Sequence, residues 1–211
     1  MNTNSLNVSP VAKRLATGIR REQIIEACLR LISRQGIEAL NIAAIADEIG
    51  LVPSAIYRHF SGKEEILESV NGLIGERLLG NIRRVCGATG DTVERLHLLL
   101  ESHVGIVLKD NGVPRYVFST GAQGSQSEQK LKLYQVVQLY LKRVAGLFVD
   151  GQRAGRIRPG LDPETLAYMF LGLIQPAILL RQMSDGQFDI EEQVDKAWNV
   201  FIHAVSVEGN L

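Results

Sequence analysis

Apolar residues recur along most of the chain at the three- and four-residue spacing of an amphipathic α-helix. The first such stripe consists of Ile24, Ala27, Cys28, Leu31 and Ile32. Similar stripes, divided by turn residues, predict nine helices, at about 17–35, 42–49, 53–60, 61–85, 91–110, 115–120, 128–152, 163–183 and 189–207. Period-two alternation nowhere coincides with β-branched residues, so the pattern predicts no strand. The expected fold is all-α.

Capping residues mark the ends of these predicted helices. Gly36 and Gly50 follow the first two helices, as C-terminal cap residues do. Asn41 is expected to cap the second helix, and Ser61 with Glu64 forms a capping-box pattern at the start of the fourth. Three later helices begin with an acidic cap residue, and these are Asp91, Asp162 and Asp189.

Pattern and charge together divide the chain into three parts. Residues 1–16 are polar and aperiodic, and we expect a flexible basic arm. Residues 17–63 form a head of short helices, and residues 64–211 form a body of longer ones. Over 1–63, eight basic residues stand against five acidic ones, whereas the remainder has fifteen basic and eighteen acidic residues. A cationic head on an anionic body is typical of a nucleic-acid-binding module joined to another unit.

The stretch 40–67 carries the most informative pattern. It predicts two short helices joined by a tight turn at 50–52. The inward positions are Ile42, Ile45, Ile49, Ile56 and Phe60. The outward positions of the second helix are Ser54, Ala55, Tyr57, Arg58 and His59. A helix with this outward face can enter the major groove of DNA, where Arg58 would pair with guanine and Tyr57 and Lys63 would reach phosphates.

The same residues resemble a known family. Residues 21–67 are similar to the DNA-binding domain of the tetracycline-repressor (TetR) family. The matching pieces are I-I-x-A at 24–27, the glycine at 36, I-A at 45–46, the G-L-V turn at 50–52 and A-I-Y-R-H-F-S-G-K-E-E-I-L at 55–67. The resemblance implies about nine helices: three in a helix-turn-helix head, a fourth that links head and body, and a body that binds a ligand and dimerises.

The resemblance also implies roles for individual residues. Asn41 would cap the second helix and touch a phosphate. The residues facing bases would be Ser54, Ala55 and Arg58, and those contacting the DNA backbone would be Tyr57, His59 and Lys63. Many family members carry a polar residue where this chain has Ala43 or Ala44. Base recognition is therefore expected to fall on Arg58 and the arm.

The stretch 166–183 is apolar nearly all round, and a helix in a small protein cannot bury every face in its own core. Pairing with a second copy would cover it, and the last helix supplies a second apolar stripe. We expect a two-fold homodimer. Its predicted interface residues are Phe170, Ile174, Ile178, Trp198, Phe201 and Ile202.

Polar and aromatic residues of the body are candidates for an effector site. They are His97, His103, Arg115, Phe118, Tyr134, Gln138, Tyr168 and Met169. Each has an ordinary alternative: the histidines as solvated or hydrogen-bonded groups, the aromatic residues as core. The surrounding composition favours a largely apolar small molecule, with Arg115 or Gln138 orienting a polar end. Three glycines in 63–85 would soften the link to the head: Gly72, Gly75 and Gly80.

The patterns predict a sequence-specific DNA-binding regulator. With the resemblance, the expected action is that of a repressor released from its operator by a largely apolar effector, although the sequence does not distinguish a repressor from an activator. The alternative is an architectural or adaptor protein whose body binds a protein partner. Enzyme motifs, metal-ligand spacings and cofactor loops are not found in the sequence, so we expect no enzyme, metal or cofactor. The apolar run 166–180 is shorter than a membrane span and is broken at 175–176. With Cys28 and Cys86 read as buried free thiols, we expect a cytoplasmic protein without membrane attachment.

Overall fold

The computed structural model describes residues 10–109, 112–122 and 128–207, with side chains at 18–109, 112–120 and 128–207. Within these residues the chain forms ten α-helices and one 3₁₀ turn, with no strand. The elements are α1 (Pro10–Gln35), η1 (Ile37–Ala39), α2 (Ile42–Glu48), α3 (Pro53–Ile56), α4 (Lys63–Ala88), α5 (Thr92–Lys109), α6 (Gly112–Ala122), α7 (Glu128–Arg153), α8 (Pro163–Gly172), α9 (Gln175–Met183) and α10 (Ile190–Val205). The all-α prediction is confirmed.

The tenth helix arises because the predicted helix 163–183 is two helices. The chain turns at Leu173 and Ile174, so that α8 ends and α9 begins with Pro176 in its first turn. Proline lacks the N–H that a continuous helix needs there, and its ring clashes with the carbonyl four residues earlier. By length and composition alone, 163–183 could cross a membrane. In this fold Leu166 and Phe170 are instead buried in the body core.

Two further differences concern the N-terminal ends of helices. α1 begins at Pro10, so residues 10–16 of the predicted arm are helical; residues 1–9 lie outside the described residues. At the start of α4, Ser61 donates its backbone N–H to Oε2 of Glu65 at 2.7 Å, and Gly62 is the residue before the helix. The predicted partner Glu64 is one residue too early, because the helix begins at Lys63.

The other predicted caps are confirmed. Oδ1 of Asn41 accepts the N–H of Ala44 at 2.9 Å at the start of α2. Gly36 and Gly50 have φ of 83° and 66°, a left-handed conformation that glycine adopts without strain. The three acidic caps accept N–H groups at 3.0, 2.8 and 2.9 Å, for Asp91, Asp162 and Asp189 respectively.

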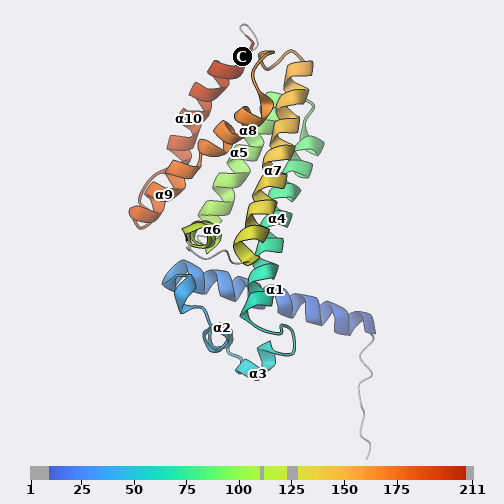
Figure 1. Cartoon of the computed structure of the whole chain (residues 1–211), viewed down its shortest axis with the longest axis vertical. Coiled ribbons are helices and arrows are strands. Elements are labelled where there is room, and N and C mark those ends of the chain that lie inside the picture. The colour runs from blue at the N-terminus through green and yellow to red at the C-terminus, as the bar shows by residue number, and fades with distance from the viewer. Residues whose placement is uncertain (1–9, 110–111, 123–127, 208–211) are drawn as a thin grey trace, which may run out of the picture.

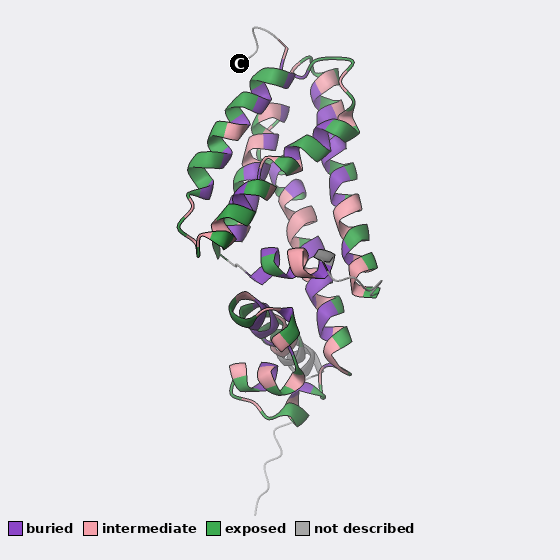
Figure 2. Ribbon diagram, turned by 60° about the vertical axis from the view of Figure 1, so that its left-hand side comes forward, coloured by how far each residue is buried: buried purple, intermediate pink, exposed green. Residues whose placement is uncertain are grey.

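The head lies at one end of the molecule, and α4 runs from it into the body (Figure 1). The body helices turn their buried faces toward a common interior (Figure 2). The head has its own hydrophobic core, but this core also takes residues from the body. Those residues are Ile66, Leu67, Val70 and Ile74 of α4, Val113 and Tyr116 of α6, and Leu133 of α7. The predicted boundary after residue 63 therefore falls inside one packed cluster.

The C-terminal end of α10 is tied to the loop after α7. Arg158 donates its N–H to the carbonyl of Val205 at 2.8 Å, and Val207 donates to that of Arg156 at 3.2 Å. The loop folds closely over the end of α7 at Gly151, where a Cβ atom would lie 2.6 Å from Cγ1 of Ile157. This close approach explains the glycine.

The two cysteines differ in environment. Cys28 is buried, as predicted, and burial raises the pKa of its thiol to about 12. Cys86 is exposed on α4, so the prediction of a buried thiol was wrong there. Both are free. The prediction failed because the apolar pattern around Cys86 indicates a helix but does not show which side of α4 other helices pack against there.

Candidate DNA-binding surface and effector cavity

The head forms the predicted helix-turn-helix. α2 and α3 are joined by a tight turn in which Leu51 donates its N–H to the carbonyl of Ala46 at 2.8 Å. Ile45, Ala46 and Ile56 are fully buried, and Phe60 nearly so. Ile45, Ile56 and Phe60 thus confirm the predicted inward positions, whereas Ile42 and Ile49 are half-buried. Regular α-helix ends at Ile56, and residues 57–59 continue as turns rather than as the predicted helix to Phe60.

The recognition segment, which consists of α3 and the turn residues 57–59, presents the predicted DNA-contacting residues. Ser54, Tyr57 and Arg58 are exposed, while Ala55 and His59 are half-buried beside them. Lys63, in the first turn of α4, is also half-buried, and Asn41 is exposed at the start of α2. The structure thus brings these seven residues onto the head at and around α3. Their individual contacts to bases or phosphates stay predictions.

Arg21 holds the end of this segment in place. Its guanidinium lies 3.9 Å over the ring of Phe60 and donates to the carbonyl of His59. It also pairs with Glu65 at 3.0 Å. The N–H of Ser61, followed by the guanidinium of Arg21, holds the pKa of Glu65 below its ordinary value. Sequence reasoning gave Arg21 no such role, because the contact spans more than one helix and leaves no local pattern.

Two other arginines of the head are engaged within the protein. Arg30 pairs with Glu48 at 3.0 Å, and Arg34 pairs with the same carboxylate. The hydrogen bond from Arg30 is the main reason that the pKa of Glu48 lies below its ordinary value. The pair joins α1 to α2. Part of the positive charge counted in the head therefore fixes the helices rather than facing outward.

The body has a small, partly open apolar pocket of about 190 Å³, here called the inner cavity. It lies between α4, α5, α6, α7 and the α8–α9 segment. Its lining residues are Ile74, Leu78, His103, Ile106, Val107, Val113, Pro114, Val117, Phe118, Val137, Tyr140, Leu171, Ile174, Gln175 and Ile178. Such a cavity can take a hydrocarbon chain, since ligand sites are mostly apolar with a few placed polar groups.

Two polar groups of the inner cavity lack partners. Nε2 of His103 and the hydroxyl of Tyr140 are buried without a hydrogen-bond partner among the described residues. The two rings lie 5.1 Å apart between centroids. Burial lowers the pKa of His103 to about 4, so the ring is neutral at pH 7, and it raises the pKa of Tyr140. Buried polar groups usually have partners, so this pair is suited to a polar atom of a ligand.

The predicted effector residues are only partly brought together. His103 and Phe118 line the inner cavity, whereas Arg115 lines a separate cleft near the head. Gln138 and Tyr168 lie at a groove between α7 and α8, and His97 stacks on Trp198 at a centroid distance of 5.1 Å. Tyr134 and Met169 are exposed and do not line the cavity. The missed lining residues are mostly aliphatic, and nothing local distinguishes them from ordinary core.

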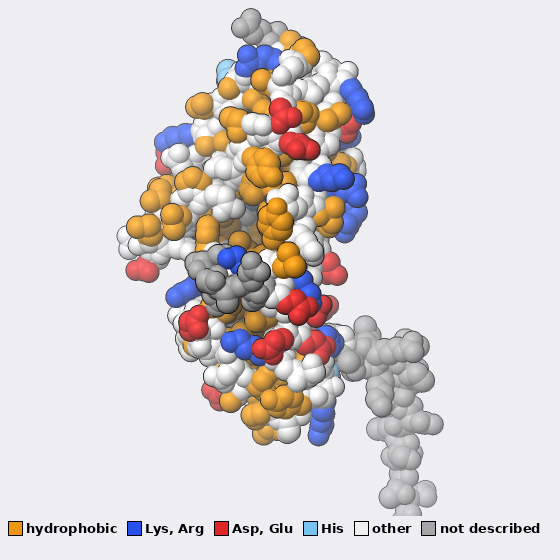
Figure 3. Space-filling view, in the orientation of Figure 1, with side chains coloured by type: hydrophobic (Ala, Val, Ile, Leu, Met, Phe, Trp, Pro, Cys, Tyr) orange, Lys and Arg blue, Asp and Glu red, His pale blue; other side chains and the backbone are white. Residues whose placement is uncertain are grey.

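The residues predicted for the dimer interface lie on the inner side of their helices. All six are buried in the body core: Phe170, Ile174, Ile178, Trp198, Phe201 and Ile202. The exposed apolar residues of the same helices are Tyr168, Met169, Leu179, Leu180, Met183 and Val200, here called the apolar face. Hydrophobic side chains gather over the region of α9 in Figure 3. Helical periodicity led to the buried stripe as the predicted interface, because the largest apolar residues of these helices lie on the side that packs in the core.

Residues 24–70 match the family model of bacterial regulatory proteins of the tetR family, and residues 74–204 match that of the C-terminal region of YsiA-like proteins. The fatty acid metabolism regulator protein of Bacillus subtilis (strain 168) is 27% identical over 172 residues, which cover 80% of this chain and 86% of that protein. Nucleoid occlusion factor SlmA of Vibrio vulnificus (strain YJ016) is 26% identical over 184 residues, covering 85% and 92%.

A solved structure shows the same fold. The transcriptional regulator FadR from Bacillus subtilis, in complex with stearoyl-CoA, superposes with a TM-score of 0.71 at 22% identity, covering 90% of this chain and 98% of that chain. The two family models together span the head and almost the whole body. The helix-turn-helix with its exposed recognition face agrees with them. The chain is a DNA-binding transcriptional regulator, and it belongs to the tetR family of bacterial regulatory proteins.

Proposed function

We propose that this regulator is a repressor that binds its operator as a two-fold dimer and leaves it when a largely apolar effector occupies the inner cavity. The observation that carries the proposal is the inner cavity itself. It is apolar, and its two buried polar groups, on His103 and Tyr140, have no partner among the described residues. Two buried polar groups without hydrogen bonds lower the stability of the folded protein, but they can bind a polar atom of a ligand.

The helices around the inner cavity also hold the head. α4 lines the cavity with Ile74 and Leu78 and begins at the recognition segment. α6 lines it with Val117, whereas Tyr116 lies in the head core and donates to Oδ1 of Asn71 at 2.9 Å. A molecule that favours a wider cavity therefore favours a shifted α4 and α6. The equilibrium moves only by the difference in the ligand's affinity for the two states.

The relatives indicate the class of effector. One regulates fatty acid metabolism, and FadR binds stearoyl-CoA in the solved complex. A long hydrocarbon chain agrees with the aliphatic lining of the inner cavity in this chain. The cavity, at about 190 Å³, is smaller than the roughly 300–1,000 Å³ of typical ligand sites. We therefore expect it to expand on binding.

The apolar face gives the dimer its interface. Tyr168, Leu179, Leu180 and Val200 are each about half exposed or more on α8, α9 and α10. Exposed apolar residues that gather on one surface, as they do over α9 in Figure 3, mark an association site. A two-fold pairing would place two copies of α3 about one turn of DNA, roughly 34 to 36 Å, apart. On each copy the DNA contacts would come from α3, the turn residues 57–59, Asn41 and Lys63.

The similarity to the nucleoid occlusion factor SlmA supports a second candidate function. In that case the chain would be a DNA-binding adaptor whose body binds a protein partner. A fully packed body would fit that role. The inner cavity with its unpaired polar groups supports the effector-controlled repressor instead. The proposed regulator acts in the cytoplasm by binding rather than by catalysis.

The test is a titration of the protein–operator complex. The operator is selected from genomic fragments that the protein retains, and operator affinity is measured with increasing stearoyl-CoA. We expect affinity to fall at least tenfold. Val137→Trp, which fills the inner cavity, should abolish the response. The matched control is Gln135→Trp, because residue 135 lies on the exposed side of α7.

Constant operator affinity across the titration, together with no measurable binding of stearoyl-CoA, would contradict effector control by this class of molecule. Equal responses of the two tryptophan variants would place the effector elsewhere in the body.

A further inference from the structure

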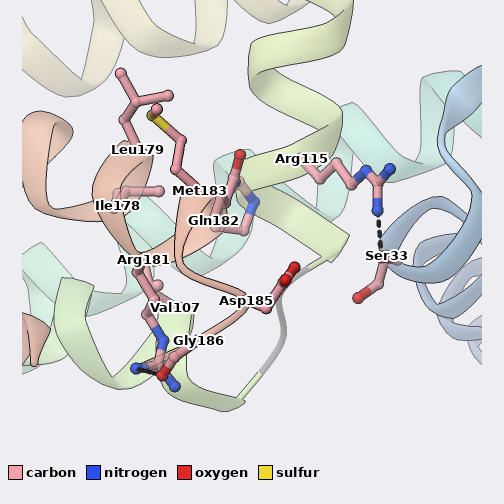
Figure 4. Close-up of a pocket in the computed structure, with 11 residues that line it drawn as sticks. Ser33, Val107, Arg115, Ile178, Leu179, Arg181, Gln182, Met183, Asp185 and Gly186 are labelled. Atoms are coloured by element: carbon pink, nitrogen blue, oxygen red, sulfur yellow. Dashed lines mark hydrogen bonds between the residues drawn. The ribbon is translucent and has the colours of Figure 1, made fainter. Parts of the chain in front are cut away.

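We propose that the cleft between α1, α6 and α9 binds the anionic head group of the same effector whose hydrocarbon part occupies the inner cavity. This inference rests on the proposed function and names the chemistry of its ligand: an amphipathic molecule with a carboxylate or phosphate at one end. The cleft, here called the outer cleft, has a volume of about 480 Å³. Figure 4 shows most of its residues on these three helices and in the turn after α9, with Ser33 on α1, Arg115 on α6 and Val107 added by α5.

The outer cleft adjoins the inner cavity. Three residues line both: Val107 of α5, Pro114 of α6 and Ile178 of α9. These residues form a common wall, so a molecule that occupies both spaces must displace their side chains. The two spaces together reach the size of ordinary ligand sites, whereas the inner cavity alone does not.

The outer cleft carries more positive than negative charge. Its charged side chains are Arg115, Arg181 and Asp185. Arg115 is exposed and donates to the carbonyl of Ser33 at 2.7 Å. Arg181 donates to the carbonyls of Gly186 and Phe188 at 2.8 and 3.1 Å. Neither guanidinium forms an ion pair with any carboxylate of the described residues, although a guanidinium binds a carboxylate or phosphate more strongly than a carbonyl.

Further donors at the outer cleft are unused. Nε2 of Gln182 and Nε of Arg181 are buried without a partner among the described residues. Both side chains come from α9 and line the outer cleft (Figure 4). A local shift of α9 would open these buried donors to the oxygens of an anion, whereas a neutral apolar molecule would leave them unpaired.

The position of Arg115 gives the head group a direct effect on the head. Ser33 lies in the last turn of α1, where carbonyl groups have no partner within the helix. Arg115 supplies that partner and so links α6 to α1. An anion that draws Arg115 into the outer cleft removes the link. The head group thus acts on α1 while the hydrocarbon part acts on α4 and α6.

The experiment compares two probes of equal chain length, decanoate and 1-decanol, by calorimetric titration of the full chain. Wild type should bind decanoate about tenfold more tightly than decanol. In Arg115→Gln the affinity for decanoate should fall about tenfold while that for decanol is unchanged. Arg115→Lys keeps the positive charge but loses the two-pronged hydrogen bonding of the guanidinium, so its affinity for decanoate should lie between those of wild type and Arg115→Gln. Arg143→Gln, an exposed arginine of α7 away from the outer cleft, should behave as wild type.

Decanoyl-CoA, which offers phosphates in place of the carboxylate, identifies the head group. The proposal is supported if either anionic probe binds more tightly than decanol and if this difference is lost in Arg115→Gln. The anionic probe with the higher affinity shows whether the head group is a carboxylate or a phosphate. The same variant should also lose the fall in operator affinity that the anionic probe causes.

The two proposals fail differently. If decanol and both anions bind equally, and Val137→Trp removes all three, the inner cavity is an effector site and the outer cleft is not a head-group site. If Arg115→Gln still binds the anionic probes more tightly than decanol, the outer cleft is not the head-group site. If no probe binds, both proposals fall.

Discussion

Arg58 is the residue on which base recognition is expected to depend. It is exposed on the outward face next to Tyr57, and the predicted second source of base contacts, at 43–44, holds alanines. Arg58→Ala should therefore weaken specific operator binding by about 1–3 kcal/mol and relax the preference for the base pair it contacts. Operator titrations against single-base variants measure both effects. Arg143→Ala in the body is the control, and an unchanged base preference in Arg58→Ala would rule out this role.

His103 makes stability depend on pH. Its pKa is 6.5 in the reference state and about 4 in the folded protein, because burial disfavours the charged ring. As pH falls, the unfolded chain binds the proton first, so the free energy of unfolding declines below about pH 6.5. We expect a loss of about 2 kcal/mol between pH 7 and pH 5, measured by urea unfolding.

The control separates His103 from other titrating groups. His103→Leu should remove this part of the pH dependence, whereas His203→Gln, at an exposed position of α10, should leave it in place. The same slope in wild type and His103→Leu would show that His103 is not buried in its neutral form.

At the scale of the element, α7 offers a matched pair of glycines. A Cβ at Gly151 would lie 2.6 Å from Ile157 and 3.1 Å from Thr92, whereas one at Gly146 would meet nothing within 4 Å. Gly151→Ala should destabilise the protein by roughly 1–3 kcal/mol through overpacking. Gly146→Ala should stabilise it by up to about 1 kcal/mol through helix propensity. Denaturant unfolding compares the two, and a stable Gly151→Ala would mean that the loop after α7 yields easily.

Element positions were largely predictable because periodicity and capping are local. Asn41 and the acidic caps act within four residues, so the sequence contains the whole interaction. The sequence marks a break in the apolar run at 175–176, but one helix over 163–183 was predicted because the pattern is apolar on both sides of that break. The cap at Ser61 was assigned to Glu64 rather than Glu65, an error of one residue in where α4 begins.

The site was less predictable than the fold. The exposed residues of α3 carry a family motif and could be named in advance. The inner cavity and the outer cleft depend on how five or more helices fail to fill a space, which no local pattern records. The contact of Arg115 with Ser33 joins residues 82 positions apart, and only the folded structure brings them together.

At the scale of the whole molecule, the apolar face predicts the assembly. Leu180→Glu places a charge on this face, so the dimer should weaken and operator affinity should fall with it. Sedimentation measures the first effect and operator titration the second. Leu131→Glu on α7, another exposed leucine outside the apolar face, should remain dimeric. A dimeric Leu180→Glu that binds its operator normally would exclude the apolar face as the interface.

The shared core of head and body determines where this regulator can be recombined with others. Joining the head of one protein to the body of another after residue 63 would separate Ile24 and Phe60 from Val113, Tyr116 and Leu133 in the same cluster. Each mismatched pair would leave a void or a clash there. A chimera that keeps its specificity and its response should therefore carry α6 and the first turns of α7 along with the head.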